Sequence, residues 1–175
     1  MFVGSSSRDI RLDSSVVVSG PSLGTKAIGS EVDVNEAGKA EAFRAVAPTG
    51  GTIDRLSVYV AKKTKAKALV AGVYADNNGH PGKLLASGRL ASPTAGEWND
   101  VPIIPSTAIA AGQSYWIALL GIGGVLNLQD ECCGSQGSQP SETSRSTSLS
   151  SLPPVWSTGT VFPHDGPVSA YALLH

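Results

Sequence analysis

The feature that most constrains the fold of this chain is a succession of short apolar runs, each ended by residues typical of turns. Within several runs apolar and polar residues alternate, so that Leu56, Val58 and Val60 share one face of an extended segment. The other face of that segment carries Arg55, Ser57 and Tyr59. Runs of this length and period predict β-strands. The predicted strands are residues 40–47, 52–60, 68–75, 83–90, 98–104, 113–120, 125–129 and 168–174.

Turn-forming residues separate these strands, and no segment keeps a helical period. Proline, glycine and asparagine gather at 48–51, 76–82, 93–96 and 110–112. A parallel α/β fold would need crossover connections of about a dozen residues or more, and these joins are too short for that. We therefore predict an all-β protein, an antiparallel β-sandwich of jelly-roll type.

The domain is predicted to span residues 26–175. Residues 1–25 are rich in serine and glycine and are predicted to be a linker or N-terminal extension, with one short strand at Ser15–Val18. A second polar stretch, residues 134–151, has almost no apolar side chain and is predicted to be a long exposed loop.

The charge balance argues against a nucleic-acid partner. Charged residues make up only 15% of the chain and the formal net charge is −1, whereas phosphate binding needs a basic face. The one basic cluster, Lys62–Lys67 (KKTKAK), is interpreted as a solvated loop between two strands. No apolar stretch reaches the ~18–20 residues of a membrane helix, so membrane insertion is not expected.

The start of the chain bears on localisation. Residues 1–15 lack the uninterrupted apolar core of a signal peptide. Either export is directed by something outside this chain, or Met1 is an artificial start on an excised module. We favour excision from a longer protein with further domains.

Several strings of residues together resemble a known kind of module. They are GTIDRLSVYV (51–60), AGVYADNNGHPGKLLASG (71–88), AGEWNDVPI (95–103), AGQSYWIALLG (111–121), PSETS (140–144) and LPPVWSTG (152–159). As a set they resemble a β-sandwich accessory module of secreted multidomain bacterial proteins. The resemblance covers roughly residues 26–173. Such modules lie beside glycoside hydrolases, lectin-like sandwiches and fibronectin-like repeats, which implies an extracellular role on a cell surface or a polysaccharide.

The two cysteines of the chain are adjacent, Cys132 and Cys133. Neighbouring Cα atoms lie about 3.8 Å apart, and ordinary disulfides prefer about 4.4–6.8 Å, so a bridge between them would be strained. Because free thiols are uncommon in oxidising compartments, export predicts such a vicinal disulfide. The alternatives are two reduced thiols or pairing with another chain. Neither cysteine has the spacing of a zinc site.

Each tryptophan has its own alternatives. Trp116 lies in an apolar run and is predicted to be a core residue, and Trp98 is either a core edge or an exposed platform. Trp156 follows two prolines, where its indole either stacks on a sugar or packs under the loop. The predicted carbohydrate-binding face is the loop end formed by Asp130, Glu131, Cys132, Cys133, Trp156 and His164, with Trp98 as a further candidate.

Calcium is the one cofactor for which the sequence offers candidates. Asp76 and Asn78 alternate as in a calcium loop, but Gly79 comes one step early, so a hairpin turn is the favoured interpretation. A second possibility joins acidic residues near the first strand to one near the last. Its members are Glu31, Asp33, Glu36 and Asp165.

Catalytic motifs are absent from the sequence. It has no G-x-S-x-G elbow, no H-E-x-x-H and no glycine-rich phosphate loop. A serine triad would depend on His80 or His164, both in turn-like contexts, and a carboxylate pair for glycoside cleavage stays open because separations are unknown. The hypothesis is therefore a noncatalytic, secreted glycan-binding module. The alternative is a structural or adhesive spacer that binds protein partners. A glycoside-active enzyme is the third and least favoured hypothesis.

Overall fold

A computed structural model describes residues 20–131 and 138–175, so Cys132, Cys133 and Ser15–Val18 lie outside the described residues. The described residues form strands and no helix. The strands are β1 (Ser22–Gly24), β2 (Glu31–Asn35), β3 (Ala40–Val46), β4 (Gly51–Val60), β5 (Ala68–Asn77), β6 (His80–Ala91), β7 (Glu97–Ile109), β8 (Ser114–Ile122), β9 (Leu126–Asp130), β10 (Gln139–Ser144), β11 (Thr158–Gly166) and β12 (Ala170–Leu173). All-β structure is confirmed, and each predicted run from residue 40 onward overlaps a strand. Nothing in the described residues forms a helix that is long and apolar enough to cross a bilayer.

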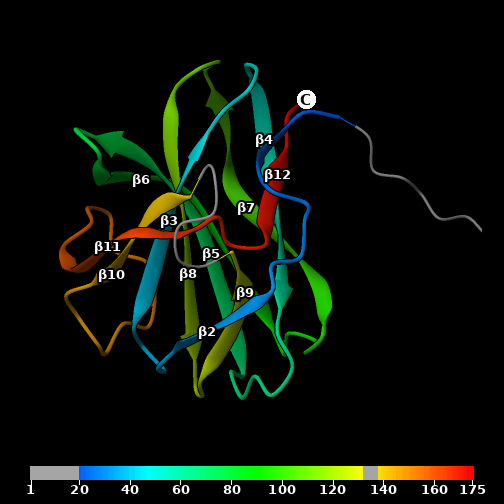
Figure 1. Cartoon of the computed structure of the whole chain (residues 1–175), viewed down its shortest axis with the longest axis vertical. Coiled ribbons are helices and arrows are strands. Elements are labelled where there is room, and N and C mark those ends of the chain that lie inside the picture. The colour runs from blue at the N-terminus through cyan, green and yellow to red at the C-terminus, as the bar shows by residue number, and fades with distance from the viewer. Residues whose placement is uncertain (1–19, 132–137) are drawn as a thin grey trace, which may run out of the picture.

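All strand pairs are antiparallel, and together they make one curled sheet (Figure 1). Its path runs β1-β12-β4-β7-β6-β5-β8-β3-β10-β11, with β9 joined to β4 and β2 joined to β9. We call the strands β1, β2, β4, β7, β9 and β12 the first arm, and the strands β3, β5, β6, β8, β10 and β11 the second arm. The arms are linked through β6 and β7, where Ser87 pairs with Ile104.

The main core lies between the two arms. From the first arm, Leu56, Val58 and Val60 are fully buried, which confirms the alternation predicted for β4. They share one apolar cluster with side chains of the second arm. Those side chains include Phe43, Leu69, Val73, Ile117 and Leu119.

A second apolar cluster covers the opposite face of the second arm. Trp116 of β8 and Tyr74 of β5 are fully buried there, as expected of a core tryptophan. Leu152 and Trp156, from the segment between β10 and β11, close over them. The middle strands of the second arm are therefore buried on both faces.

The prediction of an exposed loop over 134–151 holds for residues 145–151, which are mostly exposed and lie outside the strands, but is wrong for residues 139–144. Residues 139–144 form β10, which pairs with β3 on one side and β11 on the other, and its last four side chains are buried. Polar side chains can be buried when other polar groups satisfy them. Glu142, which is fully buried, contacts His80 at 2.5 Å and accepts a bond from Thr158 Oγ1 at 2.6 Å.

Strand β1 lies within residues 1–25, the range predicted to be a linker or N-terminal extension. Ser22 pairs with Leu173 and Gly24 pairs with Tyr171, so this part of the range belongs to the sheet. Strand β2 was also not predicted. It has only Val32 and Val34 as apolar residues, and both point away from the core with more than half of their surface exposed.

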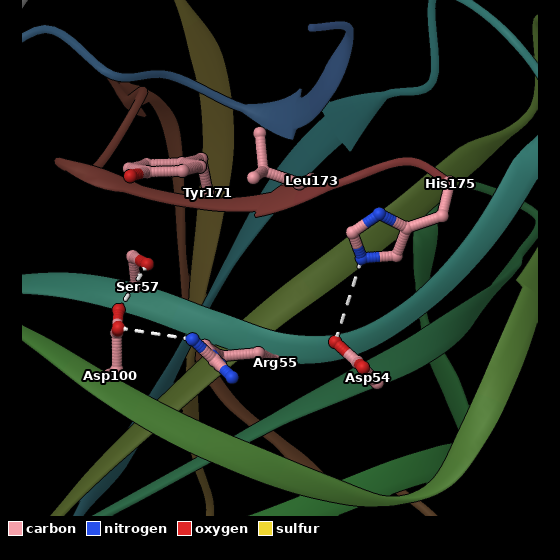
Figure 2. Close-up of a pocket in the computed structure, with 7 residues that line it drawn as sticks. All are labelled: Asp54, Arg55, Ser57, Asp100, Tyr171, Leu173 and His175. Atoms are coloured by element: carbon pink, nitrogen blue, oxygen red, sulfur yellow. Dashed lines mark hydrogen bonds and ion pairs between the residues drawn. The ribbon is translucent and has the colours of Figure 1, made fainter. Parts of the chain in front are cut away.

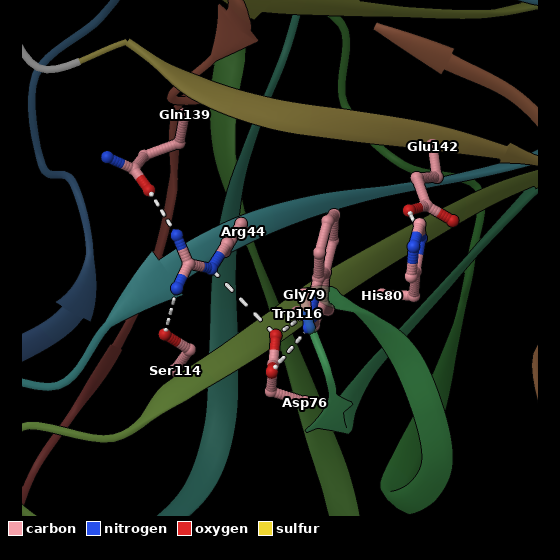
Figure 3. Close-up of polar contacts among 8 residues, drawn as sticks. All are labelled: Arg44, Asp76, Gly79, His80, Ser114, Trp116, Gln139 and Glu142. Atoms are coloured by element: carbon pink, nitrogen blue, oxygen red, sulfur yellow. Dashed lines mark hydrogen bonds and ion pairs between the residues drawn. The ribbon is translucent and has the colours of Figure 1, made fainter. Parts of the chain in front are cut away.

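The predicted hairpin turn at Asn78 and Gly79 is present. Both residues have positive φ, 54° and 84°, as a two-residue turn of type I′ requires. Asn77 and His80 pair across it. The Asp76 carboxylate accepts bonds from the Gly79 amide at 2.9 Å and from the Trp116 indole at 2.8 Å (Figure 3).

Candidate functional site

The outer face of β12, β4 and β7 carries the side chains that face away from the main core. Alternation along β4 turns Ser57 and Tyr59 to this face while their neighbours are buried. In register with them, Tyr171 pairs with Ser57, Ser57 with Asp100, and Tyr59 with Trp98. Strand pairing therefore gathers residues from three distant parts of the chain on one surface.

Three aromatic rings lie next to one another on this face. The Trp98 ring meets the edge of Tyr59 at a centroid distance of 5.6 Å and of Tyr171 at 5.2 Å. All three side chains are half-buried. Edge-to-face pairs of this kind stabilise each other and hold the rings in fixed positions. The Tyr59 hydroxyl is fixed as well, because it donates to the Gly96 carbonyl at 3.0 Å.

A small polar pocket of about 130 Å³ adjoins the aromatic rings (Figure 2). A bulge in β4 after Ile53 leaves both Asp54 and Arg55 exposed. Ser57 Oγ donates to Asp100 Oδ1 at 2.5 Å, and Arg55 Nη1 donates to Asp100 Oδ2 at 3.4 Å. His175 Nε2 lies 3.7 Å from Asp54 Oδ1. We call the aromatic rings and this pocket together the aromatic face.

The aromatic face combines two properties that saccharide sites use. Apolar C–H faces of a sugar ring stack on aromatic rings, and neighbouring polar side chains hydrogen-bond its hydroxyls. Lys26 adds a cation, with its Nζ 5.6 Å from the Tyr171 ring centroid. The face thus offers rings, hydrogen-bond donors and hydrogen-bond acceptors within one continuous surface.

A cluster of acidic residues lies between the arms, at the edge where β2 and β9 face β3, β10 and β11. Ser141 Oγ is 2.7 Å from Glu41 Oε1 and 2.8 Å from Asp165 Oδ2. A hydroxyl has one proton to donate, so both contacts are hydrogen bonds only if one carboxyl is protonated and donates in turn. We call Asp33, Glu41, Asp130 and Asp165 the carboxyl cluster.

Burial raises the pKa of three carboxyl groups of this cluster, those of Glu41, Asp130 and Asp165. It raises the pKa of Glu41 to about 9, with the nearby Asp33 carboxylate adding to the shift. It also raises the pKa of Asp130 to about 7, and neighbouring carboxylates, Asp33 first, add to it. The pKa of Asp165 is raised by burial in the same way. Asp130 Oδ1 is buried without a hydrogen-bond partner.

The calcium candidates separate into two groups. Asp33 and Asp165 do come together, in the carboxyl cluster, as the second possibility required. Asp76 and Asn78 lie in the β5–β6 turn, where the Asp76 carboxylate is held by Gly79 and Trp116 (Figure 3). Within residues 20–131 and 138–175, no three His, Cys, Asp or Glu side chains are arranged to hold a metal ion in common. Calcium at Asp33 and Asp165 stays a prediction.

The predicted loop-end site is not assembled as expected. Trp156 is only 7% exposed and packs against Tyr74 in the second apolar cluster, so of its two alternatives the structure shows packing. Asp130 is 2% exposed, in the carboxyl cluster, and cannot present its side chain to a ligand on the surface. Glu131 is half-buried and His164 is exposed on β11, with its Nδ1 3.4 Å from Ser138 Oγ.

Of the predicted site residues within 20–131 and 138–175, Trp98 alone lies on the aromatic face. Tyr59, Asp100, Tyr171 and Arg55 were not predicted as site residues. The alternation of apolar and polar residues did predict that Tyr59 and Arg55 lie on the outer face of their strand, so the position of these two side chains was predictable. The strand pairing that brings Tyr171 and Asp100 beside them leaves no local trace in the sequence.

No protein-family model matches this chain, and no match to it was found among curated proteins or solved structures.

Proposed function

We propose that this protein is a noncatalytic glycan-binding module and that the aromatic face is its binding surface. The observation that carries the proposal is the row of Tyr59, Trp98 and Tyr171 beside the Arg55–Asp100 pair. This differs from the loop-end site expected from the sequence, because Trp156 and Asp130 are buried. The ligand class is the same.

The fold supports the proposal through its architecture. The two arms enclose one apolar core between them, which favours a β-sandwich of jelly-roll type over an open sheet. A β-sandwich has two outer sheet faces. In this chain the outer face of the second arm is largely covered by the segment that includes Leu152 and Trp156, whereas the outer face of β12, β4 and β7 keeps half-buried aromatic rings.

A binding role suits the aromatic face better than catalysis does. The carboxyl groups whose pKa is raised, such as Glu41 and Asp130, are buried between the arms, where a polysaccharide does not reach. On the aromatic face, Asp100 is already engaged by Ser57 and Arg55. We therefore propose an accessory module, secreted and joined to other domains, that directs those domains to a polysaccharide or a surface glycan.

The test is retention on polysaccharides in affinity gels, with the Trp98→Ala variant beside the unmodified chain. Removal of the central indole takes away both edge-to-face contacts, and we expect retention to be lost while the chain stays folded. Phe162→Ala is the matched control, because Phe162 is a partly exposed aromatic residue on β11, outside the aromatic face. Its retention should equal that of the unmodified chain.

A spacer without glycan affinity would give a different pattern. If no polysaccharide in a broad panel retards the unmodified chain, the glycan proposal fails and the structural or adhesive alternative takes its place. If Phe162→Ala loses retention and Trp98→Ala keeps it, glycan binding stands but the aromatic face does not carry it.

A further inference from the structure

A groove continues from the aromatic face along the outer side of β2 and β9. Its volume is about 590 Å³, and Tyr59 lines it as well as belonging to the aromatic face. The remaining lining residues come from the segment before β2, from β2, from the end of β4 with the turn that follows, and from β9. They are Ile28, Val32, Val34, Ala61, Lys62, Lys63, Asn127 and Gln129.

The floor of the groove is apolar and exposed. Ile28, Val32 and Val34 keep about half of their surface in contact with water, at 50%, 53% and 55%. Val32 pairs with Gln129 and Val34 pairs with Asn127, so each apolar side chain has an amide next to it. Such a floor matches a ring that has apolar faces and polar edges.

Asn127 lines this groove and has one side-chain hydrogen-bond acceptor without a partner. Its side chain is 9% exposed, and its Oδ1 is buried without a partner. The amide orientation is set by the other end of the side chain, because Nδ2 donates to the Lys62 carbonyl at 3.2 Å. A buried acceptor without a partner costs free energy, which a ligand hydroxyl at this position would recover.

Two lysines lie at the groove on a turn of fixed shape. Lys62 and Lys63 are exposed, and of the described residues that line the groove none is acidic. Lys63 has φ of 70°, a backbone conformation that persists only where its surroundings enforce it. Thr64 Oγ1 accepts from the backbone amide of Asn127 at 2.9 Å and donates to the backbone carbonyl of Asn127 at 3.1 Å. These two bonds hold the turn against β9.

We propose that this groove binds an acidic polysaccharide, one whose sugar rings carry carboxylate groups. The rings would lie on the valine floor, Asn127 Oδ1 would accept from a hydroxyl, and the ammonium groups of Lys62 and Lys63 would pair with the carboxylates. The ring row of the aromatic face extends the same site through Tyr59. This inference rests on the proposed glycan binding and names its ligand class. It also gives a role to two lysines of the basic cluster Lys62–Lys67, which was predicted to be a solvated loop.

The experiment compares acidic polymers with their carboxyl-reduced, neutral forms. Polygalacturonate and alginate are each titrated into the full chain by calorimetry, beside the reduced form of the same polymer. We expect at least one acidic polymer to bind about tenfold more tightly than its neutral form, a difference of ~1.4 kcal/mol. Added salt should weaken the acidic interaction more than the neutral one, since exposed charges are screened.

The double variant Lys62→Gln/Lys63→Gln should remove the preference for the acidic form, so that the acidic and neutral forms of each polymer bind with equal affinity. Lys65→Gln is the matched control, because Lys65 is an exposed lysine of the same basic cluster that does not line the groove. Val34→Ser tests the floor and should weaken binding of both forms. Equal melting temperatures across these exposed-site variants confirm that each chain is folded.

The outcomes separate the two proposals. Equal binding of acidic and neutral forms, abolished by Trp98→Ala, would overturn the acidic ligand and keep the glycan-binding function. If neither form of either polymer binds but some neutral polysaccharide retains the chain, the acidic ligand is again overturned and the glycan-binding function is kept. A dimer in sedimentation analysis that Val34→Ser dissociates would assign the groove to a second copy of the chain and overturn the inference.

Discussion

The ring of Tyr74 meets the indole of Trp156 edge to face, with centroids 5.3 Å apart and an interplanar angle of 77°. The Tyr74 hydroxyl also donates to the Pro153 carbonyl at 2.6 Å, so the segment before Trp156 is fixed at two points. Burial raises the pKa of Tyr74 well above its ordinary value, which keeps this donor protonated. Trp156 thus closes the outer face of the second arm.

Replacement of this indole is expected to cost stability and not binding. Trp156→Ala removes a large aromatic side chain from the second apolar cluster, and deletions of this kind cost about 3–5 kcal/mol. Urea unfolding followed by circular dichroism measures the loss. Trp156→Phe should lose less, because the indole Nε1 has no hydrogen-bond partner to forfeit. A stable Trp156→Ala chain that no longer binds glycan would return this residue to the binding surface.

The carboxyl cluster makes stability depend on pH in a defined direction. Glu41 and Asp130 have folded-state pKa values of about 9 and about 7, raised from 4.5 and 3.8. The folded state therefore binds protons more tightly than the unfolded chain, so this contribution is complete below about pH 4 and is lost as pH rises towards 9. We expect the melting temperature to fall across this range.

Variants divide the pH effect between its two main groups. Asp130→Asn should remove the part of the decrease that ends near pH 7, and Glu41→Gln the part that extends to about 9. Glu36→Gln, at an exposed position, serves as the control and should leave the curve unchanged. A melting temperature that rises from pH 5 to 9 would contradict the assignment. The same titration with calcium tests the predicted ion site, because a bound cation would replace the protons and abolish the decrease.

The junction between the arms is expected to tolerate no extra atom at Gly88. A Cβ placed there would lie 1.8 Å from the Pro102 carbonyl oxygen of β7, closer than any real contact. Gly88→Ala should therefore force β6 and β7 apart and destabilise the chain by about 1–3 kcal/mol or more. Gly50→Ala is the control, because its Cβ would meet its nearest neighbour at 3.4 Å. Equal unfolding free energies of these variants would show that β6 and β7 can separate without loss.

The vicinal disulfide stays a prediction, since Cys132 and Cys133 lie outside the described residues. We expect the oxidised protein to take up no alkylating reagent without reductant, as measured by intact mass. Because a bridge between neighbours is strained, mild reductant should open it more readily than an ordinary structural disulfide. Two labels per chain before reduction would exclude the bridge.

The strands that follow a simple alternation were predictable from sequence, and β4 is the best example. Its inward residues Leu56, Val58 and Val60 are all fully buried, and Tyr59 on its other face turned out to belong to the candidate site. Strand β10 was not predictable. Its Ser141 is satisfied by Glu41, a hundred residues away in the chain, and polar composition alone indicates solvent exposure.

The candidate site was predicted only in part for a related reason. Trp98 is one of three aromatic rings, of which the other two, Tyr59 and Tyr171, lie on β4 and β12, and the register of these strands is set by backbone pairing. Trp156 and Asp130 were predicted to lie on the binding surface, but both are buried. A tryptophan that follows two prolines and an aspartate at the end of a strand are as compatible with exposure as with burial. Trp156 packs against Tyr74 and Asp130 lies near other carboxyl groups, and sequence periodicity encodes neither arrangement.

The pairing of Ser22 with Leu173 brings the first and last strands of the fold to the same place. When a polypeptide enters and leaves a domain at neighbouring points, the domain can lie within a longer chain with little change to the path of the residues on either side. Units of this geometry can be transplanted into a surface loop of an unrelated host without stretching it. The antiparallel contact of β1 and β12 therefore makes this domain suitable for insertion into a surface loop of another protein.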